Sequence, residues 1–312
     1  MNIQQFQYVL AVAEYKHFEL AAEKCTISQS TLSTMISKFE DEMGIKIFDR
    51  KKKPVDLTSE GSLLIKQLKL ILNNIEQLRE LTREIKGEVT GSLNLSVIPT
   101  IAPFLLPLFL QEFASQFPNL NIVVKEETTE EIQKKLHLRE IDIGIASIPL
   151  NDKDLYEVKM YDEQFLFYDA HKTSGEKLSV NQLKNKNLCL MEEGHCIRTQ
   201  VSELCNKNAI KNKSSLNFDY KAGSIDSLIR FVKASQSSTL LPYLATINFT
   251  KQEQKNLSHF TAPIPYRTIG LIVHRHFVKK KILSSLQNSI IKNVSPKLPA
   301  IELKGKMLQP VL

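Results

Sequence analysis

Two cysteines with basic neighbours are the residues of this sequence best suited to do chemistry. Cys196 lies in the segment Gly194-His195-Cys196-Ile197-Arg198, and Cys205 follows it nine residues later. Cationic or donor groups such as those of His195 and Arg198 favour the thiolate form of an adjacent cysteine. A thiolate attacks peroxide to give a sulfenic acid, which a second thiol converts to a disulfide.

The spacing of this pair favours a switch over a structural crosslink. On a continuous helix, Cα atoms nine residues apart are separated by about 13 Å. A disulfide requires Cα atoms within about 7 Å, so its formation would break or reorganise the segment. The alternative is that both cysteines are buried and act as small hydrophobic side chains. The residues alone leave these two interpretations open.

Other kinds of reactive site are less well supported. Cys25 and Cys189 have apolar neighbours and are expected to be structural. The seven histidines show no ligand spacing with cysteines beyond the adjacent His195-Cys196, so we expect no metal site and no cofactor. A cysteine enzyme built on that adjacent pair is an alternative, but no third residue that would orient it is identifiable. We therefore expect a protein that is not an enzyme.

The N-terminal residues predict a DNA-binding motif. Apolar positions at helical spacing indicate helices over residues 3–15, 18–24 and 29–42, with a tight connection at residues 25–27. Ser28 is the expected N-cap of the third helix and Gly44 its end. The first turns of the second helix in such a motif reach base edges in the major groove. Contacts with double-stranded DNA are expected from Ser28, Gln29, Ser30, Thr31 and Ser33.

A basic turn and a long helix follow the motif. Strand-like residues 45–50 and 55–57 flank the turn and predict a wing, in which Arg50 and Lys52 would hold phosphates. Thr58 is the expected cap of a helix that continues to about residue 87. Seven of its residues alternate by four and three positions, as in a heptad seam, and all except Thr82 are apolar: Leu64, Leu68, Ile71, Ile75, Leu78, Thr82 and Ile85. We expect a homodimer through this helix, the alternative being a core helix of one chain.

Strands and helices alternate in the rest of the chain, which is typical of an α/β domain with a mainly parallel sheet. We predict strands over residues 93–98, 120–124, 141–145, 165–168, 188–191, 218–220 and 269–273, and helices over 103–117, 130–138, 228–234 and 282–294. Its length allows two subdomains with a cleft between them. The chain is thus divided into a winged helix-turn-helix domain (1–58), a linker and dimerisation helix (59–87) and a regulatory domain (88–312).

Composition and charge agree with a globular protein. The 312 residues are 42% hydrophobic and 24% charged, which excludes a disordered or collagen-like chain. The net charge of +7 arises at the basic C-terminus, because the first 90 residues hold 13 basic and 13 acidic side chains. The N-terminus lacks an export signal. The uncharged run 89–111 contains prolines and polar residues. We therefore expect a cytoplasmic protein with no membrane contact.

Residues 1–62 resemble the N-terminal domain of LysR-type transcriptional regulators. The match comprises residues 6–13, Phe18 with Ala21-Ala22, Ser28-Gln29 with Leu32-Ser33 and Ile36, Phe39-Glu40 with Gly44, Phe48-Asp49-Arg50, and Leu57-Thr58 with Gly61. The resemblance covers the linker helix and the α/β domain as well. It implies an all-α winged helix-turn-helix domain and an α/β regulatory domain with two subdomains of the periplasmic-binding-protein type. Ser30 and Met35 depart from the usual Pro and Gln, which leaves the DNA sequence open.

The segment from Met191 to Arg198, with Cys205, resembles the redox segment of the hydrogen-peroxide-responsive members of that family. The resemblance implies that Cys196 is the peroxidatic cysteine and Cys205 the resolving one. It places Thr100 and Thr129 at the peroxide, and His195, Arg198 and Arg267 as support for the thiolate. Ser235-Gln236-Ser237, where glycines are usual, and Tyr266, where Arg is usual, are departures near this pocket.

The resemblance implies an activator of oxidative-stress genes that responds to hydrogen peroxide, assembles as a homotetramer and contacts RNA polymerase. The alternative within the same architecture is a sensor of a small organic effector bound between the subdomains. Thr100, Thr129 and Ser224 would then bind the effector, and both cysteines would be bystanders.

Overall fold

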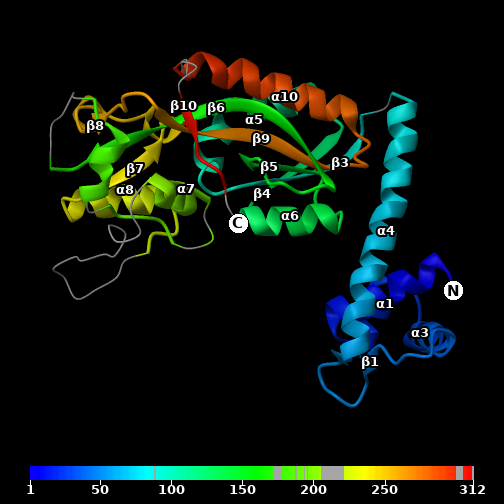
Figure 1. Cartoon of the computed structure of the whole chain (residues 1–312). Coiled ribbons are helices and arrows are strands. Elements are labelled where there is room, and N and C mark those ends of the chain that lie inside the picture. Colours follow the sequence, from blue (N-terminus) through cyan, green and yellow to red (C-terminus); the bar gives the residue numbers. More distant parts are fainter. Residues whose placement is uncertain are drawn as a thin grey trace. The chain divides into compact units, whose positions relative to one another are not determined.

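The chain divides into two units, Met1–Thr82 and Arg83–Leu312 (Figure 1). The computed structural model describes residues 1–87, 89–171, 177–186, 188–192, 194, 196–204, 221–299 and 305–310. Within these ranges, no helix combines the length and apolar character needed to cross a membrane. The uncharged run 89–111 instead contains a strand and most of a helix.

Three short helices build the N-terminal unit as predicted: α1 (Ile3–Tyr15), α2 (Phe18–Lys24) and α3 (Gln29–Met43). The Ser28 side chain caps α3 by accepting a hydrogen bond from the Thr31 amide. Gly44 ends the helix in the left-handed region, with φ of 68°, which glycine adopts without steric cost. Leu32 and Ile36 are fully buried, so the inward face of the expected recognition helix is confirmed.

The wing is held to α3 by one buried carboxylate. Strands β1 (Phe48–Asp49) and β2 (Asp56–Leu57) pair antiparallel. Glu40 of α3 is 1% exposed, and its Oε1 accepts from the amides of Ile47 (2.8 Å) and Phe48 (3.3 Å). Its Oε2 accepts from the Arg50 guanidinium at 3.4 Å. The wing therefore keeps a fixed position beside the recognition helix.

Helix α4 (Ser59–Ile85) changes its environment along its length. Thr58 Oγ1 accepts from the Gly61 amide at 2.8 Å and caps the helix. Ile65 and Leu68 then pack into the core of the N-terminal unit. Further along, Ile71, Leu78 and Ile85 are exposed in the single chain. The second half of α4 thus presents apolar side chains that this chain leaves uncovered.

The second unit contains a mixed sheet in the order β4-β3-β5-β9-β6-β7, with β10 paired to β9 and β8 to β6. The strands are β3 (Gly91–Val97), β4 (Leu120–Glu126), β5 (Ile143–Ile148), β6 (Leu155–Asp169), β7 (Ser238–Pro242), β8 (Leu257–Ser258), β9 (Ile264–His274) and β10 (Gly305–Met307). The expectation of a mainly parallel sheet is wrong. Strands β3, β4 and β5 are parallel and β10 is parallel to β9, but β9 runs antiparallel to β5 and β6, and β6 runs antiparallel to β7 and β8. The long strands β6 and β9 return across the sheet instead of adding βαβ units.

Two hydrophobic cores divide this unit, which confirms the two predicted subdomains. In the first, helices α5 (Ala102–Gln116) and α10 (Lys280–Val294) lie on one face of the sheet, and α6 (Thr129–His137) covers the other (Figure 1). The second surrounds the far half of β6 with β7, α7 (Cys196–Leu204) and α8 (Ile225–Ala234). The short helices are η1 (Val180–Asn185), η2 (Tyr243–Thr246), α9 (Lys251–Gln254) and η3 (Ser295–Lys297).

One of the predicted strands, residues 188–191, is not a strand of this sheet. Residues 188–191 form only isolated bridges, Leu188 with Ser238 and Met191 with Ala222. A short apolar run cannot by itself distinguish a ladder from such bridges. The strand predicted over 218–220 lies outside the described residues.

Replacing Glu40 with alanine should destabilise the N-terminal unit by about 2–4 kcal/mol, because two buried amides would lose their acceptor. Glu42→Ala on the same helix is the matched control. Glu42 forms an exposed ion pair with the N-terminus, and such pairs contribute about 0–1 kcal/mol. Urea unfolding monitored by circular dichroism measures both variants. Equal midpoints for the two would contradict the role given to Glu40.

Candidate functional site

Cys196 lies at the junction of the two cores of the second unit. It is the first residue of α7 and is 5% exposed. Its side chain belongs to the first core, whereas Ile197, Val201 and Leu204 of the same helix belong to the second. Movement of α7 would therefore disturb both subdomains.

A buried ion pair lies beside this thiol. Arg267 on β9 and Glu163 on β6 are register partners in the antiparallel ladder, and each side chain is 1% exposed. Arg267 Nε donates to Glu163 Oε2 at 2.8 Å, and the Leu244 amide donates to Glu163 Oε1 at 2.8 Å. Arg267 also donates to Thr100 Oγ1 (3.1 Å) and to the Thr100 carbonyl (3.2 Å). Such bonds are needed because an unpaired buried charge is strongly destabilising.

Opposing effects act on the Cys196 thiol. Burial raises its pKa, because a thiolate loses hydration inside the protein. The Arg267 charge, the hydroxyls of Thr100 and Thr129, and the Ile197 amide lower it without cancelling the effect of burial. The resting residue is therefore a thiol at neutral pH, surrounded by groups that stabilise the thiolate once it forms. The Arg267 charge agrees with the predicted support, although the net shift is upward.

Thr129 places a buried hydroxyl beside the Cys196 sulfur. It is the first residue of α6 and is 1% exposed. Among the described residues, its Oγ1 has no hydrogen-bond partner of normal geometry. Thr128 provides the helix cap instead. A buried hydroxyl normally has a partner, so Thr129 Oγ1 is suited to an oxygen atom of a small ligand next to the sulfur.

The remaining predicted residues of this site are placed differently. Arg198 Nη1 donates to the Met191 carbonyl at 2.8 Å, which braces the segment before α7. Its role at the thiolate stays a prediction. His195 and Cys205 lie outside the described residues. Cys189 Sγ lies 3.1 Å from Ser237 Oγ, and Cys25 is half-buried in the N-terminal unit.

Two residues of the site escaped the sequence analysis. Glu163 lies between Asp162 and Gln164 in the segment 160–168, so nothing in the sequence marks it as the buried acid. Gln200 of α7 is fully buried, and its Nε2 donates to Ser147 Oγ (2.9 Å) and to the Leu308 carbonyl (3.2 Å). It ties α7 to β5 and to the segment after β10. No pattern in the sequence indicates that contact.

The predicted DNA-reading residues lie at the start of α3 and on the wing. Ser28 Oγ lies 2.8 Å from Thr31 Oγ1 and 3.0 Å from Ser30 Oγ, and Gln29 is exposed beside them. Arg50 donates to Ser33 Oγ at 2.9 Å.

Lys52 forms an exposed ion pair with Asp56 at 3.4 Å. Base and phosphate contacts by all these residues stay predictions.

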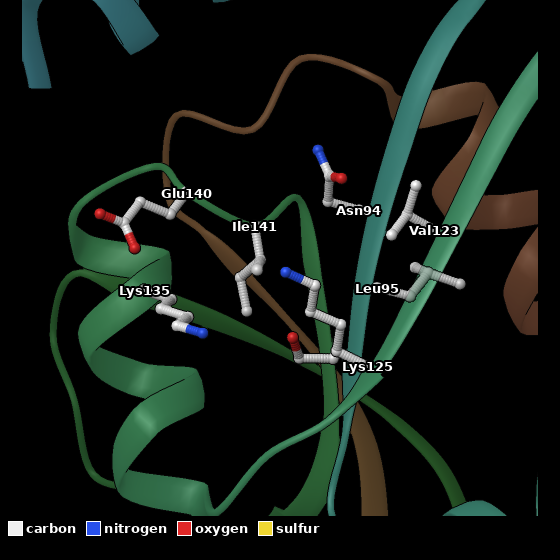
Figure 2. Close-up of a pocket in the computed structure, with 8 residues that line it drawn as sticks. Asn94, Leu95, Val123, Lys125, Lys135, Glu140 and Ile141 are labelled. Carbon is white, nitrogen blue, oxygen red and sulfur yellow. The ribbon is translucent and has the colours of Figure 1, made fainter. Parts of the chain in front are cut away.

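A shallow pocket of about 90 Å³ lies elsewhere in the second unit, between β3, β4 and α6. Figure 2 shows Lys125 on β4 and Lys135 on α6 near its centre. None of the residues required by the small-effector alternative, Thr100, Thr129 and Ser224, lines it. Ser224 is the N-cap of α8 and accepts from the Ser227 amide. The pocket therefore lends no support to that alternative.

Two family models match the chain. The model of the LysR-family bacterial regulatory helix-turn-helix protein matches residues 3–62, and that of the LysR substrate binding domain matches residues 86–285. The hydrogen peroxide-inducible genes activator of Haemophilus influenzae is 32% identical over 87% of this chain and 90% of its own. The DNA-binding transcriptional dual regulator OxyR of Escherichia coli is 31% identical over 87% and 89%.

Solved structures give the same relationship. A full-length OxyR of Pseudomonas aeruginosa with a cysteine-to-aspartate substitution is 29% identical and has a TM-score of 0.72, covering 93% of this chain and 98% of its own. A cysteine-to-serine variant of Corynebacterium glutamicum OxyR, with hydrogen peroxide bound, is 25% identical and has a TM-score of 0.62, covering 95% and 94%.

The raised pKa of Cys196 predicts how its reactivity depends on pH. Only the thiolate reacts, so the rate with a small methanethiosulfonate should rise about tenfold per pH unit from pH 6.5 to 8.5. Mass spectrometry of the peptide that contains Cys196, after timed quenching, measures the rate. A synthetic peptide with an ordinary cysteine is the control. A rate that levels off below pH 7.5 would contradict the upward shift.

Proposed function

The chain belongs to the LysR family of bacterial helix-turn-helix regulators, and from this premise we propose that it senses hydrogen peroxide through Cys196. The observation that carries the proposal is the buried thiol with the Arg267 charge and the hydroxyls of Thr100 and Thr129 close to it. The names of the relatives support the choice of oxidant. A peroxide has two oxygens that can accept from these donors, and it is small enough for a buried site.

The reaction needs only peroxide and two thiols. The Cys196 thiolate attacks one peroxide oxygen, the S–O bond forms, the O–O bond breaks, and the leaving hydroxide takes a proton to become water. The Thr129 and Thr100 hydroxyls hold the oxygens, and Arg267 stabilises the negative charge of the sulfur. The Cys205 thiolate then attacks the sulfenic sulfur, and the second oxygen leaves as water. Sulfur is oxidised and peroxide is reduced.

Formation of this disulfide requires α7 to open. Residues 196 and 204 are the ends of the helix, so their Cα atoms are about 12 Å apart at 1.5 Å per residue. The Cα atom of residue 205 lies 3.8 Å from that of residue 204 along any trans chain. It therefore stays at least about 8 Å from Cys196 while α7 persists, beyond the reach of about 7 Å for a disulfide. Oxidation would consequently release the contacts of Ile197, Gln200 and Val201.

The output of this switch is binding of promoter DNA by the N-terminal unit. We propose a homodimer through α4, whose exposed Ile71, Leu78 and Ile85 continue the 4-3 spacing. Two dimers would form the tetramer that the family resemblance implies. In a cytoplasmic activator, opening of α7 would change how this assembly binds DNA and engages RNA polymerase. The winged helix-turn-helix domain (1–58) would then bind DNA, and the linker helix (59–87) would form the dimer. The regulatory domain (88–312) would sense the peroxide.

Thr129→Val should slow oxidation of Cys196 by peroxide about 10- to 100-fold, because one hydrogen bond to the reacting oxygen is lost. Thr239→Val is the matched control, since it removes a buried hydroxyl from the second core. Peptide mass mapping after one equivalent of peroxide measures the rate and identifies the crosslinked pair. A Cys196–Cys205 link that forms equally fast in all three proteins would refute the role of Thr129.

The same mapping tests the function itself. Survival of both thiols in a large excess of peroxide would reject peroxide sensing. A Cys196→Ser protein that still changes its DNA binding on addition of an organic effector would support the alternative within the family.

Leu78→Lys should convert the assembly to smaller species, because a charge would enter the proposed helix seam. Asn74→Lys is the control, since Asn74 is exposed on the same helix but lies outside the seam. Sedimentation velocity of both variants measures the change. An unchanged sedimentation coefficient for Leu78→Lys would place the dimer interface elsewhere.

A further inference from the structure

Three segments of the second unit bring histidine and aspartate side chains together, away from the thiol. His137 is the last residue of α6, whereas Asp152 and Asp154 lie between β5 and β6. Their potential ligand atoms all lie within 4.8 Å of one another. His274 is the last residue of β9, and its ring centroid lies 6.4 Å from that of His137.

We propose that His137, Asp152 and Asp154 form a binding site for a divalent cation of the zinc type, with Nε2 of His274 as a further ligand, since its Nδ1 accepts from the His276 amide. Imidazole nitrogen and carboxylate oxygen are ligands that zinc accepts in a tetrahedral arrangement. Zinc bonds of about 2.0–2.2 Å place neighbouring ligand atoms about 3.3 Å apart. Small rotations of these side chains would therefore close the site.

The cluster offers a cation two carboxylates and an imidazole, with the charge of Arg139 acting on the neighbouring His274. His137 Nε2 lies 2.7 Å from Asp152 Oδ2, so these two ligand atoms already face one another. Asp154 Oδ1 is paired with Arg275 Nη1 at 2.9 Å, and the Arg275 side chain is 57% exposed. Exposed ion pairs of this kind contribute little to stability. A divalent cation would displace Arg275 from Asp154 at low cost, leaving the guanidinium in solvent.

A cation at this site would connect three elements of the second unit. It joins the C-terminal end of α6 to the start of β6 and the end of β9. Thr129 is at the opposite end of α6, about 12 Å from His137 at 1.5 Å per residue, and Arg267 is on β9. The cation would hold these elements together without touching the thiol. We therefore expect the cation to stabilise the second unit without changing the rate at which peroxide oxidises Cys196.

Titration of metal-free, fully reduced full-length protein with zinc chloride tests the site. Calorimetry should show a site that His137→Ala and Asp152→Asn each weaken at least tenfold. His259→Ala is the matched control, because His259 is exposed and outside the cluster. Arg275→Gln should instead tighten binding several-fold by freeing Asp154. Thermal unfolding without zinc shows whether each variant is folded. If His137→Ala does not fold, the test of zinc binding relies on Asp152→Asn, which preserves the shape of the side chain.

Cobalt(II) as a second probe separates this site from the cysteines. Cobalt bound by thiolate absorbs strongly in the near ultraviolet, whereas cobalt bound by imidazole and carboxylate does not. The proposal requires a visible cobalt spectrum without that strong band, and its loss in Asp152→Asn. Binding that the His137 and Asp152 variants leave unchanged, or that appears only with the thiolate band, would overturn it. Peroxide oxidation of Cys196, measured in the same variants, should stay unchanged.

Discussion

The buried pair of Arg267 and Glu163 is the interaction on which the second unit depends. Two charges removed from water are tolerated only when each is paired and hydrogen-bonded. Glu163 uses both oxygens for this purpose, and Arg267 reaches the hydroxyl and carbonyl of Thr100. Because the pair joins β6 and β9, which serve both cores, it fixes the junction of the subdomains. It also places a permanent positive charge close to Cys196.

That junction explains how one sulfur atom could control a domain. Burial keeps Cys196 protonated and limits access to small reagents, whereas Arg267 and the threonine hydroxyls reduce the cost of forming the thiolate. Helix α7 starts at this sulfur and packs into the second core through Ile197 and Val201. Gln200 also ties it to Leu308 beyond β10. Energy released by reduction of peroxide would therefore offset the loss of contacts in both cores when α7 opens.

Local features of the fold could be predicted from the sequence because neighbouring residues determine them. The three N-terminal helices, the Ser28 cap and the inward positions of Leu32 and Ile36 follow from spacing and capping chemistry. The direction of β9 and its register with β6 depend on residues a hundred positions apart, so the Arg267–Glu163 pair could not be predicted. The same holds for His137, Asp152 and Asp154, whose sequence spacing matches no metal motif. The family resemblance predicts Cys196, Thr100 and Arg267 as site residues, and the structure adds the groups that each of them contacts.

Helix α4 shows why the single chain is not the functional unit that we propose. Its first half is needed by the N-terminal core, where Ile65 and Leu68 are buried and Gly61 is in close contact with the Ile47 carbonyl. A side chain at Gly61 would collide with that carbonyl, so this end of the helix cannot shift. The second half has the same 4-3 spacing but no cover, and exposed Leu78 and Ile85 cost free energy in water. In the proposed assembly, a rigid helix fixed at one end and apolar at the other would transmit a change in assembly to the DNA-reading helix without any change inside the N-terminal unit.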